Sequence, residues 1–156
     1  MADNGTEWFN TGTSDLERER MMGSIGALFA THPQRPPATS LIEACVAACY
    51  ECGGLCVGCS DACLGEAHVA DLVCCIRTCL DCSDVCFASA RIVSRLTEPS
   101  PMLVEAQLMA CAEACRICVA ECERHAAMHE HCRICAKACR VCEQACRALL
   151  HGASFA

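Results

Sequence analysis

The segment from Cys45 to Cys63 reads CVAACYECGGLCVGCSDAC, and its cysteines follow one another at alternating steps of four and three residues. Such steps average about 3.5 residues, which is the spacing of side chains that share one narrow stripe of an α-helix. In a helical bundle this stripe faces the core and usually carries leucine. The segment therefore predicts a helix whose buried stripe consists of thiols.

Three further segments repeat this spacing: CCIRTCLDCSDVC from Cys74, CAEACRICVAEC from Cys111 and HCRICAKACRVCEQAC from His131. The four segments hold all 20 cysteines of the chain. The candidate metal ligands among them are Cys45, Cys49, Cys52, Cys56, Cys59, Cys63, Cys74, Cys75, Cys79, Cys82, Cys86, Cys111, Cys115, Cys118, Cys122, Cys132, Cys135, Cys139, Cys142 and Cys146. Four such helices with their stripes inward would enclose a column of sulfur. Cys74, beside Cys75, lies off the stripe.

Proline, glycine and capping residues predict where the helices begin and end. Ser14 predicts an N-cap for a short helix over residues 15–31, and Ser40 with Glu43 predicts a capping box for the first cysteine helix. Ser100 followed by Pro101 is a helix start signal. The four cysteine helices are expected over residues 41–64, 68–96, 101–125 and 130–152.

Short connections between these helices force antiparallel neighbours. The expected fold is all-α, an up-down-up-down four-helix bundle with a short extra N-terminal helix. Residues 1–39 are expected to form a tail, this short helix and a proline-rich linker, and residues 40–152 the bundle. At 156 residues the chain is long enough for one such core.

Charge and composition exclude several classes of partner. The net charge is −7 and Lys137 is the only lysine, which argues against binding to nucleic acid or to an anionic membrane surface. No continuous apolar run approaches the about 20 residues of a membrane-spanning helix, and the N-terminal segment lacks the positive charge of a signal peptide. We therefore expect a cytoplasmic protein, where thiols stay reduced.

Three other uses of many cysteines fit less well. Disulfide scaffolds are loop-rich, secreted and irregularly spaced. Zinc requires a closed site of four ligands, separated from the next site. The ferredoxin cysteine pattern of iron–sulfur proteins is absent. An iron–sulfur electron carrier and a zinc or thiol redox buffer remain as alternatives, and no constellation of catalytic groups indicates an enzyme.

Monovalent copper fits the thiol column best. Cu(I) is soft, prefers thiolate and accepts two or three ligands, so cysteines of successive turns or of facing helices can hold it. Each Cu(I) replaces one thiol proton, so a column with one copper per sulfur stays nearly neutral, whereas zinc with four thiolates would bury two uncompensated negative charges. The sequence therefore predicts many bound Cu(I) ions.

The two ends of the predicted column differ in chemistry. The third cysteine stripe continues past Cys122 to His125 and His129, and these two histidines are predicted as copper ligands. The same end collects further polar residues and a methionine: Glu66, His68, Asp71, Met128 and His131. The other end collects Leu41, Val93, Val104, Leu108 and Leu149, which predicts an apolar plug.

The four cysteine motifs resemble those of the bacterial copper storage proteins, over about residues 40–150. This resemblance implies a cysteine-lined four-helix bundle that stores Cu(I), largely through pairs of cysteines three or four residues apart. The lack of an export signal resembles the cytosolic branch, which implies a homotetramer. Carried over by position, the ligands are the stripe cysteines with His125 and His129 at the open end.

Overall fold

The computed structural model describes residues 15–152, and side chains from residue 23 onward. The chain divides into two units, Met1–Pro33 and Gln34–Ala156, which are described separately. In the first unit α1 spans Asp15–Ala30, as predicted, and its helical geometry is interrupted at Gly23. The φ of Gly23 is 70°, in the left-handed region that glycine adopts without strain. The predicted N-cap, Ser14, lies outside the described residues.

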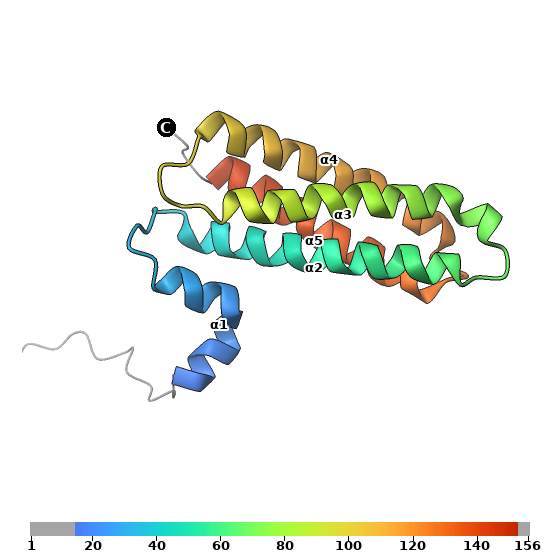
Figure 1. Cartoon of the computed structure of the whole chain (residues 1–156), viewed down its shortest axis with the longest axis horizontal. Helices are drawn as coiled ribbons and strands as arrows, with labels where there is room; N and C mark the ends of the chain where they lie inside the picture. The colour runs from blue at the N-terminus through green and yellow to red at the C-terminus, as the bar shows by residue number, and fades with distance from the viewer. Residues whose placement is uncertain (1–14, 153–156) are drawn as a thin grey trace, which may run out of the picture. The chain divides into compact units, whose positions relative to one another are not determined.

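Four long helices form the second unit. They are α2 (Thr39–Leu64), α3 (Val73–Val93), α4 (Pro101–His125) and α5 (Glu130–Gly152), with a 3₁₀ turn, η1 (Val69–Leu72), before α3. Figure 1 shows them side by side, each running opposite to its neighbour along the chain. Among the described helices, the backbones of α2 and α4 each lie beside those of α3 and α5, while the diagonal pairs meet only through side chains in the centre, such as Cys49 and Cys111. The helices thus form a square around a central column, which confirms the predicted antiparallel bundle.

The helix starts depart from the sequence expectation in two places. The capping box of Ser40 and Glu43 is wrong, because α2 begins at Thr39 and its N-cap, Ala38, makes no side-chain hydrogen bond. The Thr39 hydroxyl donates instead to the carbonyl of Pro36, so the linker backbone is tied to the first turn.

The second cysteine helix also begins later than expected. Residues 69–72 form the 3₁₀ turn, and the α-helix runs only from Val73 to Val93. Ser100 is the N-cap of α4, as predicted, with Pro101 in the first turn, although the serine side chain makes no capping bond. These differences leave the cysteine stripes intact, because every stripe cysteine still lies within one of the four α-helices.

Apolar side chains close one end of the bundle. Leu108 and Leu149 are fully buried, and Val93 and Val104 are nearly so. Outside them lies an apolar cavity of about 710 Å³, walled by Pro37, Leu96 and neighbouring residues. The predicted plug is therefore present: it consists of buried leucine and valine side chains next to an apolar cavity.

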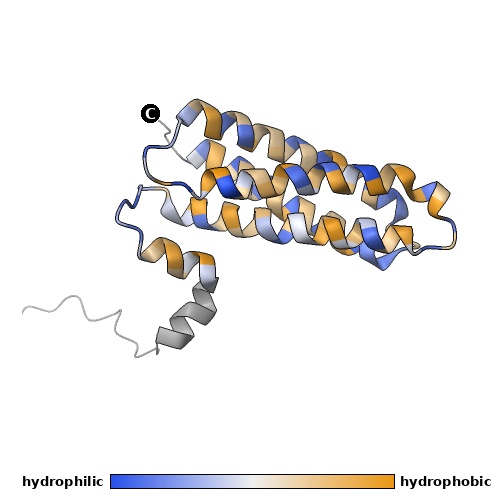
Figure 2. Cartoon of the chain, in the orientation of Figure 1, coloured by the Kyte–Doolittle hydropathy of each residue, from blue (hydrophilic) through white to orange (hydrophobic). Residues whose placement is uncertain are grey.

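Helix α2 is the most apolar of the four, and apolar colours predominate along it in Figure 2. Among the described helices, only α2 is long and apolar enough to cross a membrane, judged by length and composition alone. Its mean hydropathy is 1.5 over its most apolar window. Its cysteines contribute strongly to that value, and all of them are buried inside the bundle. Only 44% of the window is buried, so an apolar strip also lies on the outer face of α2.

Candidate metal centre

The structure places 19 of the cysteines inside the bundle and leaves Cys74 exposed. The buried set, here called the thiol column, comprises every cysteine of the four stripes, and all are free thiols. Cys74 fails to join because it directly precedes Cys75 on α3, and adjacent residues of a helix point about 100° apart. The column therefore matches the sequence prediction except at Cys74.

Thiols of the column lie in continuous contact, with sulfur–sulfur distances such as 3.5 Å for Cys52 and Cys139, and 4.0 Å for Cys63 and Cys75. Three of these contacts join cysteines one turn apart on a single helix, namely Cys52–Cys56, Cys82–Cys86 and Cys118–Cys122. The others join different helices. The closest thiol partners are therefore set mainly by packing between helices, which sequence spacing alone does not show.

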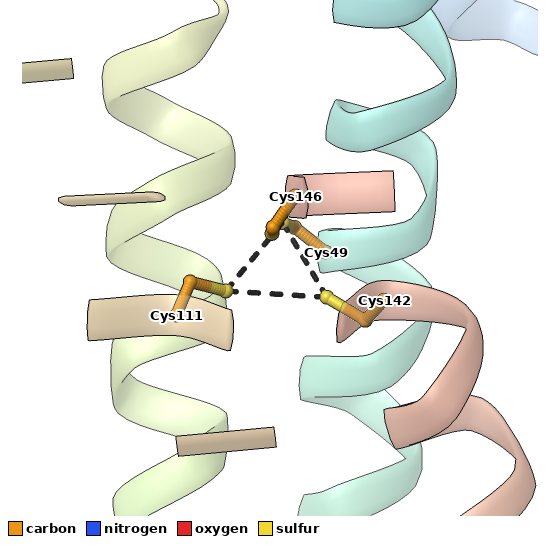
Figure 3. A group of neighbouring side chains, drawn as sticks. All are labelled: Cys49, Cys111, Cys142 and Cys146. Atoms are coloured by element: carbon orange, nitrogen blue, oxygen red, sulfur yellow. Dashed lines mark hydrogen bonds between the residues drawn. The ribbon is translucent and has the colours of Figure 1, made fainter. Parts of the chain in front are cut away.

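Groups of four thiols converge at several levels of the column. Figure 3 shows one group, Cys49, Cys111, Cys142 and Cys146, whose sulfurs point toward one another from three helices. All ligand atoms within each such group lie within 4.8 Å of one another. Three further groups are Cys52–Cys86–Cys115–Cys142, Cys52–Cys56–Cys82–Cys139 and Cys56–Cys118–Cys135–Cys139.

Successive groups share members. Cys142 belongs to two of them, as do Cys52, Cys56 and Cys139. A set of isolated tetrahedral zinc sites would not share ligands in this way. Shared thiolates suit a soft ion of low coordination number, because one sulfur can bridge two such ions.

A histidine completes the group nearest the polar end. The Nδ1 atom of His131 lies 3.4 Å from the Sγ atom of Cys59 and 3.5 Å from that of Cys132, and with Cys63 these residues form a mixed group of three sulfurs and one nitrogen. The sequence placed His131 at this end but did not select it as a ligand, because the geometry of the connection before α5 does not follow from spacing. Its ring reaches the thiols from the first turn of α5.

His125 and His129, the two histidines predicted from the cysteine stripe, form hydrogen bonds with carboxylates. His125 Nε2 lies 3.1 Å from Glu121 Oε1, and His129 Nδ1 lies 2.9 Å from Glu66 Oε1. Both histidines lie at the polar end, close to the column. The nitrogens that make these two bonds face carboxylates and not the thiols of the column. Three other residues expected at this end, His68, Asp71 and Met128, are exposed.

Burial changes the acidity of the thiols nearest this end. Burial, with the neighbouring Cys75, raises the pKa of Cys63 to about 11. Burial also raises the pKa of Cys132, again with Cys75 and Cys63 adding to the effect. Both thiols are therefore protonated at neutral pH, and a metal must displace their protons to bind.

These features define a class of protein. A closed apolar end, a column of shared thiol groups and a histidine-bearing polar end together form a protein that can bind many soft metal ions.

Comparison with known proteins agrees with this class. Residues 38–151 match the family of copper storage proteins, and the chain belongs to that family. It is similar to the copper storage protein Ccsp of Streptomyces lividans loaded with 10 copper equivalents, at 47% identity and a TM-score of 0.81, covering 83% of this chain and 100% of that one. A structure described as a cytosolic copper storage protein of the same organism, with five coppers, is 51% identical with a TM-score of 0.72, covering 74% of this chain and 96% of that one.

A further relative is also described as rich in cysteine. The uncharacterized cysteine-rich protein YhjQ of Bacillus subtilis (strain 168) is 38% identical over 96 residues, which are 62% of this chain and 83% of that protein. Family membership and the thiol column together identify the function: the chain is a copper storage protein whose cysteine-lined core binds several copper ions. This is a binding function and not an enzymatic one.

Proposed function

We propose that the chain stores Cu(I) in the cytosol, with the 19 buried cysteines as ligands and with the bundle of residues 40–152 carrying the whole store. The observation that carries the proposal is the sharing of thiols between successive groups of four. Bridging thiolates allow about one copper per sulfur, whereas unshared pairs would allow only about half as many. Cys74 lies outside the column and is not needed for the store.

Reduced thiols are a requirement of this function. A disulfide cannot bind Cu(I), and the cytosol keeps thiols reduced. The similar protein of Streptomyces lividans is described as cytosolic, which supports the same compartment for this chain.

Copper enters at the polar end. His131 contacts the first thiols of the column there, and His125 and His129 lie around it, whereas Leu108 and Leu149 seal the opposite end. Imidazole and thiolate both bind Cu(I), so the ion can move inward by exchange of one ligand at a time. Replacement of both His125 and His129 by alanine should slow uptake from a competing chelator and leave the final number of bound ions nearly unchanged.

The matched variant pair for this test lies at the other end. Leu108→Ala with Leu149→Ala alters the apolar plug and should leave the uptake rate unchanged. If the leucine variant slows uptake while the histidine variant loads like the unaltered protein, copper enters at the apolar end and the assignment is wrong.

A homotetramer is the proposed assembly, and the outer face of α2 supports contact with a second copy. Tyr50, Val57 and Leu64, at seven-residue intervals, are all exposed there. Between them, Gly54 and Gly58 have open space where a side chain would stand. Each glycine in a helix interior lowers helix stability by about 1 kcal/mol relative to alanine. The absence of a side chain at these positions allows another helix to approach closely.

The third glycine of this helix serves the bundle itself. A Cβ atom on Gly53 would lie 3.0 Å from the ring of Phe87, so Gly53 makes room for this aromatic ring of α3.

The assembly is tested at Gly54. Because Gly54 has open space on the outer face of α2, Gly54→Leu should reduce the assembly measured by analytical ultracentrifugation, while Ala120→Leu, on the exposed side of α4, should leave it unchanged. A monomer in the unaltered protein would refute the assembly proposal.

A further inference from the structure

One carboxylate joins two histidines at the polar end. Glu66 lies in the turn after α2, and its Oε1 atom is 2.9 Å from His129 Nδ1 and 3.2 Å from His131 Nε2. The Glu66 side chain is 36% exposed and the two histidine side chains are 19% and 23% exposed, so the group is half-buried. The two imidazole rings are close, with centroids 5.4 Å apart.

An ionised carboxylate accepts hydrogen bonds and cannot donate them. A glutamate carboxyl that reaches solvent is ionised at neutral pH, and the Oε1 atom of Glu66 lies within hydrogen-bonding distance of one nitrogen of each ring. Both of the nitrogens that face it must therefore carry a proton. In a neutral imidazole the other nitrogen then carries the free lone pair.

The two rings consequently have opposite tautomers. His131 is protonated at Nε2, so its lone pair is on Nδ1, which lies 3.4 Å from the Cys59 sulfur. His129 is protonated at Nδ1, so its lone pair is on Nε2. Only a histidine with an unprotonated nitrogen toward the metal can bind it.

We propose that Glu66 is a positioning residue for copper uptake: it fixes His131 as an Nδ1 ligand aimed at the thiol column and His129 as an Nε2 ligand. Copper held by His129 can then pass to His131 and from there to Cys59, Cys63 and Cys132. Metal-binding histidines commonly donate their second nitrogen to a carboxylate, which fixes the ring orientation and raises ligand basicity. The proposal rests on copper uptake at this end, as proposed above.

The direct test needs no copper. Long-range ¹H–¹⁵N correlation spectra of the reduced, metal-free protein, recorded where the imidazoles are neutral, report which nitrogen of each ring is protonated. The expected result is Nε2–H for His131 and Nδ1–H for His129. A His131 protonated mainly at Nδ1 would overturn the proposal.

Variants then link the tautomers to uptake. Glu66→Ala should give both rings mixed tautomers, weaken copper binding at the mixed group about 10- to 100-fold, and slow loading, while the final capacity stays nearly the same. Glu130→Ala is the matched control: Glu130 is next to His131 in sequence, but its carboxylate pairs with Arg133. The control should keep native tautomers and native loading.

The outcomes separate the two levels of the argument. If Glu66→Ala keeps the native tautomers, or loads copper at the native rate, Glu66 does not position the histidines for uptake. The storage proposal would be unaffected by that result. A low copper capacity in the unaltered protein would instead refute the storage proposal. The tautomers are measured without copper, so that result would not decide whether Glu66 fixes them.

Discussion

The Nδ1 atom of His131 lies 3.4 Å from the Sγ atom of Cys59, although 72 residues separate them along the chain. This contact joins the first turn of α5 to the interior stripe of α2. It marks the level at which the thiol column meets the polar end, and it makes His131 the histidine best placed to pass copper to sulfur.

Replacement of His131 by alanine should weaken the mixed group of Cys59, Cys63 and Cys132 by removing its nitrogen ligand. We expect slower uptake from a chelator and a loss of at most about one bound copper. The uptake rate and the final stoichiometry, followed by ultraviolet absorption of the thiolate–copper bond, check this. His68→Ala, an exposed histidine near the same end, is the control and should behave like the unaltered protein.

Two cysteine substitutions should differ in their effect on capacity. Cys74→Ser changes an exposed thiol outside the column and should leave the number of bound coppers unchanged. Cys139→Ser changes a buried thiol that belongs to two groups of four, so it should remove more than one copper. A loss of no more than one copper in Cys139→Ser would show that the groups do not share thiolates.

Truncation of the apolar plug should reduce stability. Leu108 and Leu149 are both fully buried, and replacement of either by alanine should lower the free energy of unfolding of the metal-free protein by about 2–5 kcal/mol. Urea denaturation followed by circular dichroism measures this. Leu103→Ala, at an exposed position of α4, should cost much less, and a similar cost at both kinds of site would argue against a sealed end.

Alkaline pH should destabilise the metal-free bundle. Burial raises the pKa of Cys63 from 9.0 to about 11, so between these values the folded state retains a proton that the unfolded chain loses. The resulting stability is fully present below pH about 9 and is lost as the pH rises through about 11. The other cysteines also titrate near this range in the unfolded chain and contribute to the same pH dependence, whereas the single lysine and the single tyrosine add little.

The measurement is the free energy of unfolding of the reduced protein at several pH values across this range. Cys63→Ser should show a shallower decline than the unaltered protein. A free energy that stays constant from pH about 9 to about 11 would contradict the burial of protonated thiols.

Sequence spacing predicted most of the fold because the cysteine stripe is itself the core. Four- and three-residue steps specify both the helix and the face that is buried, so the bundle and its 19 buried thiols followed directly. Helix starts were less predictable. Ser40 has the sequence features of an N-cap, yet the helix begins at Thr39, two residues before the expected start, and the Thr39 hydroxyl bonds to the linker carbonyl of Pro36.

The polar end was predicted in composition but not in geometry. The stripe extends to His125 and His129, but local carboxylates bond to both rings. His131 reaches the thiols from the first turn of α5, and Glu66 meets His129 across 63 residues of sequence. Such contacts depend on the packing of turns, which has no period in the sequence.

The most direct test of the account is an anaerobic titration of the reduced protein with Cu(I), with the number of tightly bound ions counted per chain. Shared thiolates predict saturation near one copper per buried cysteine, of which there are 19. Saturation at one to four metal ions per chain would contradict the thiol column as a copper store.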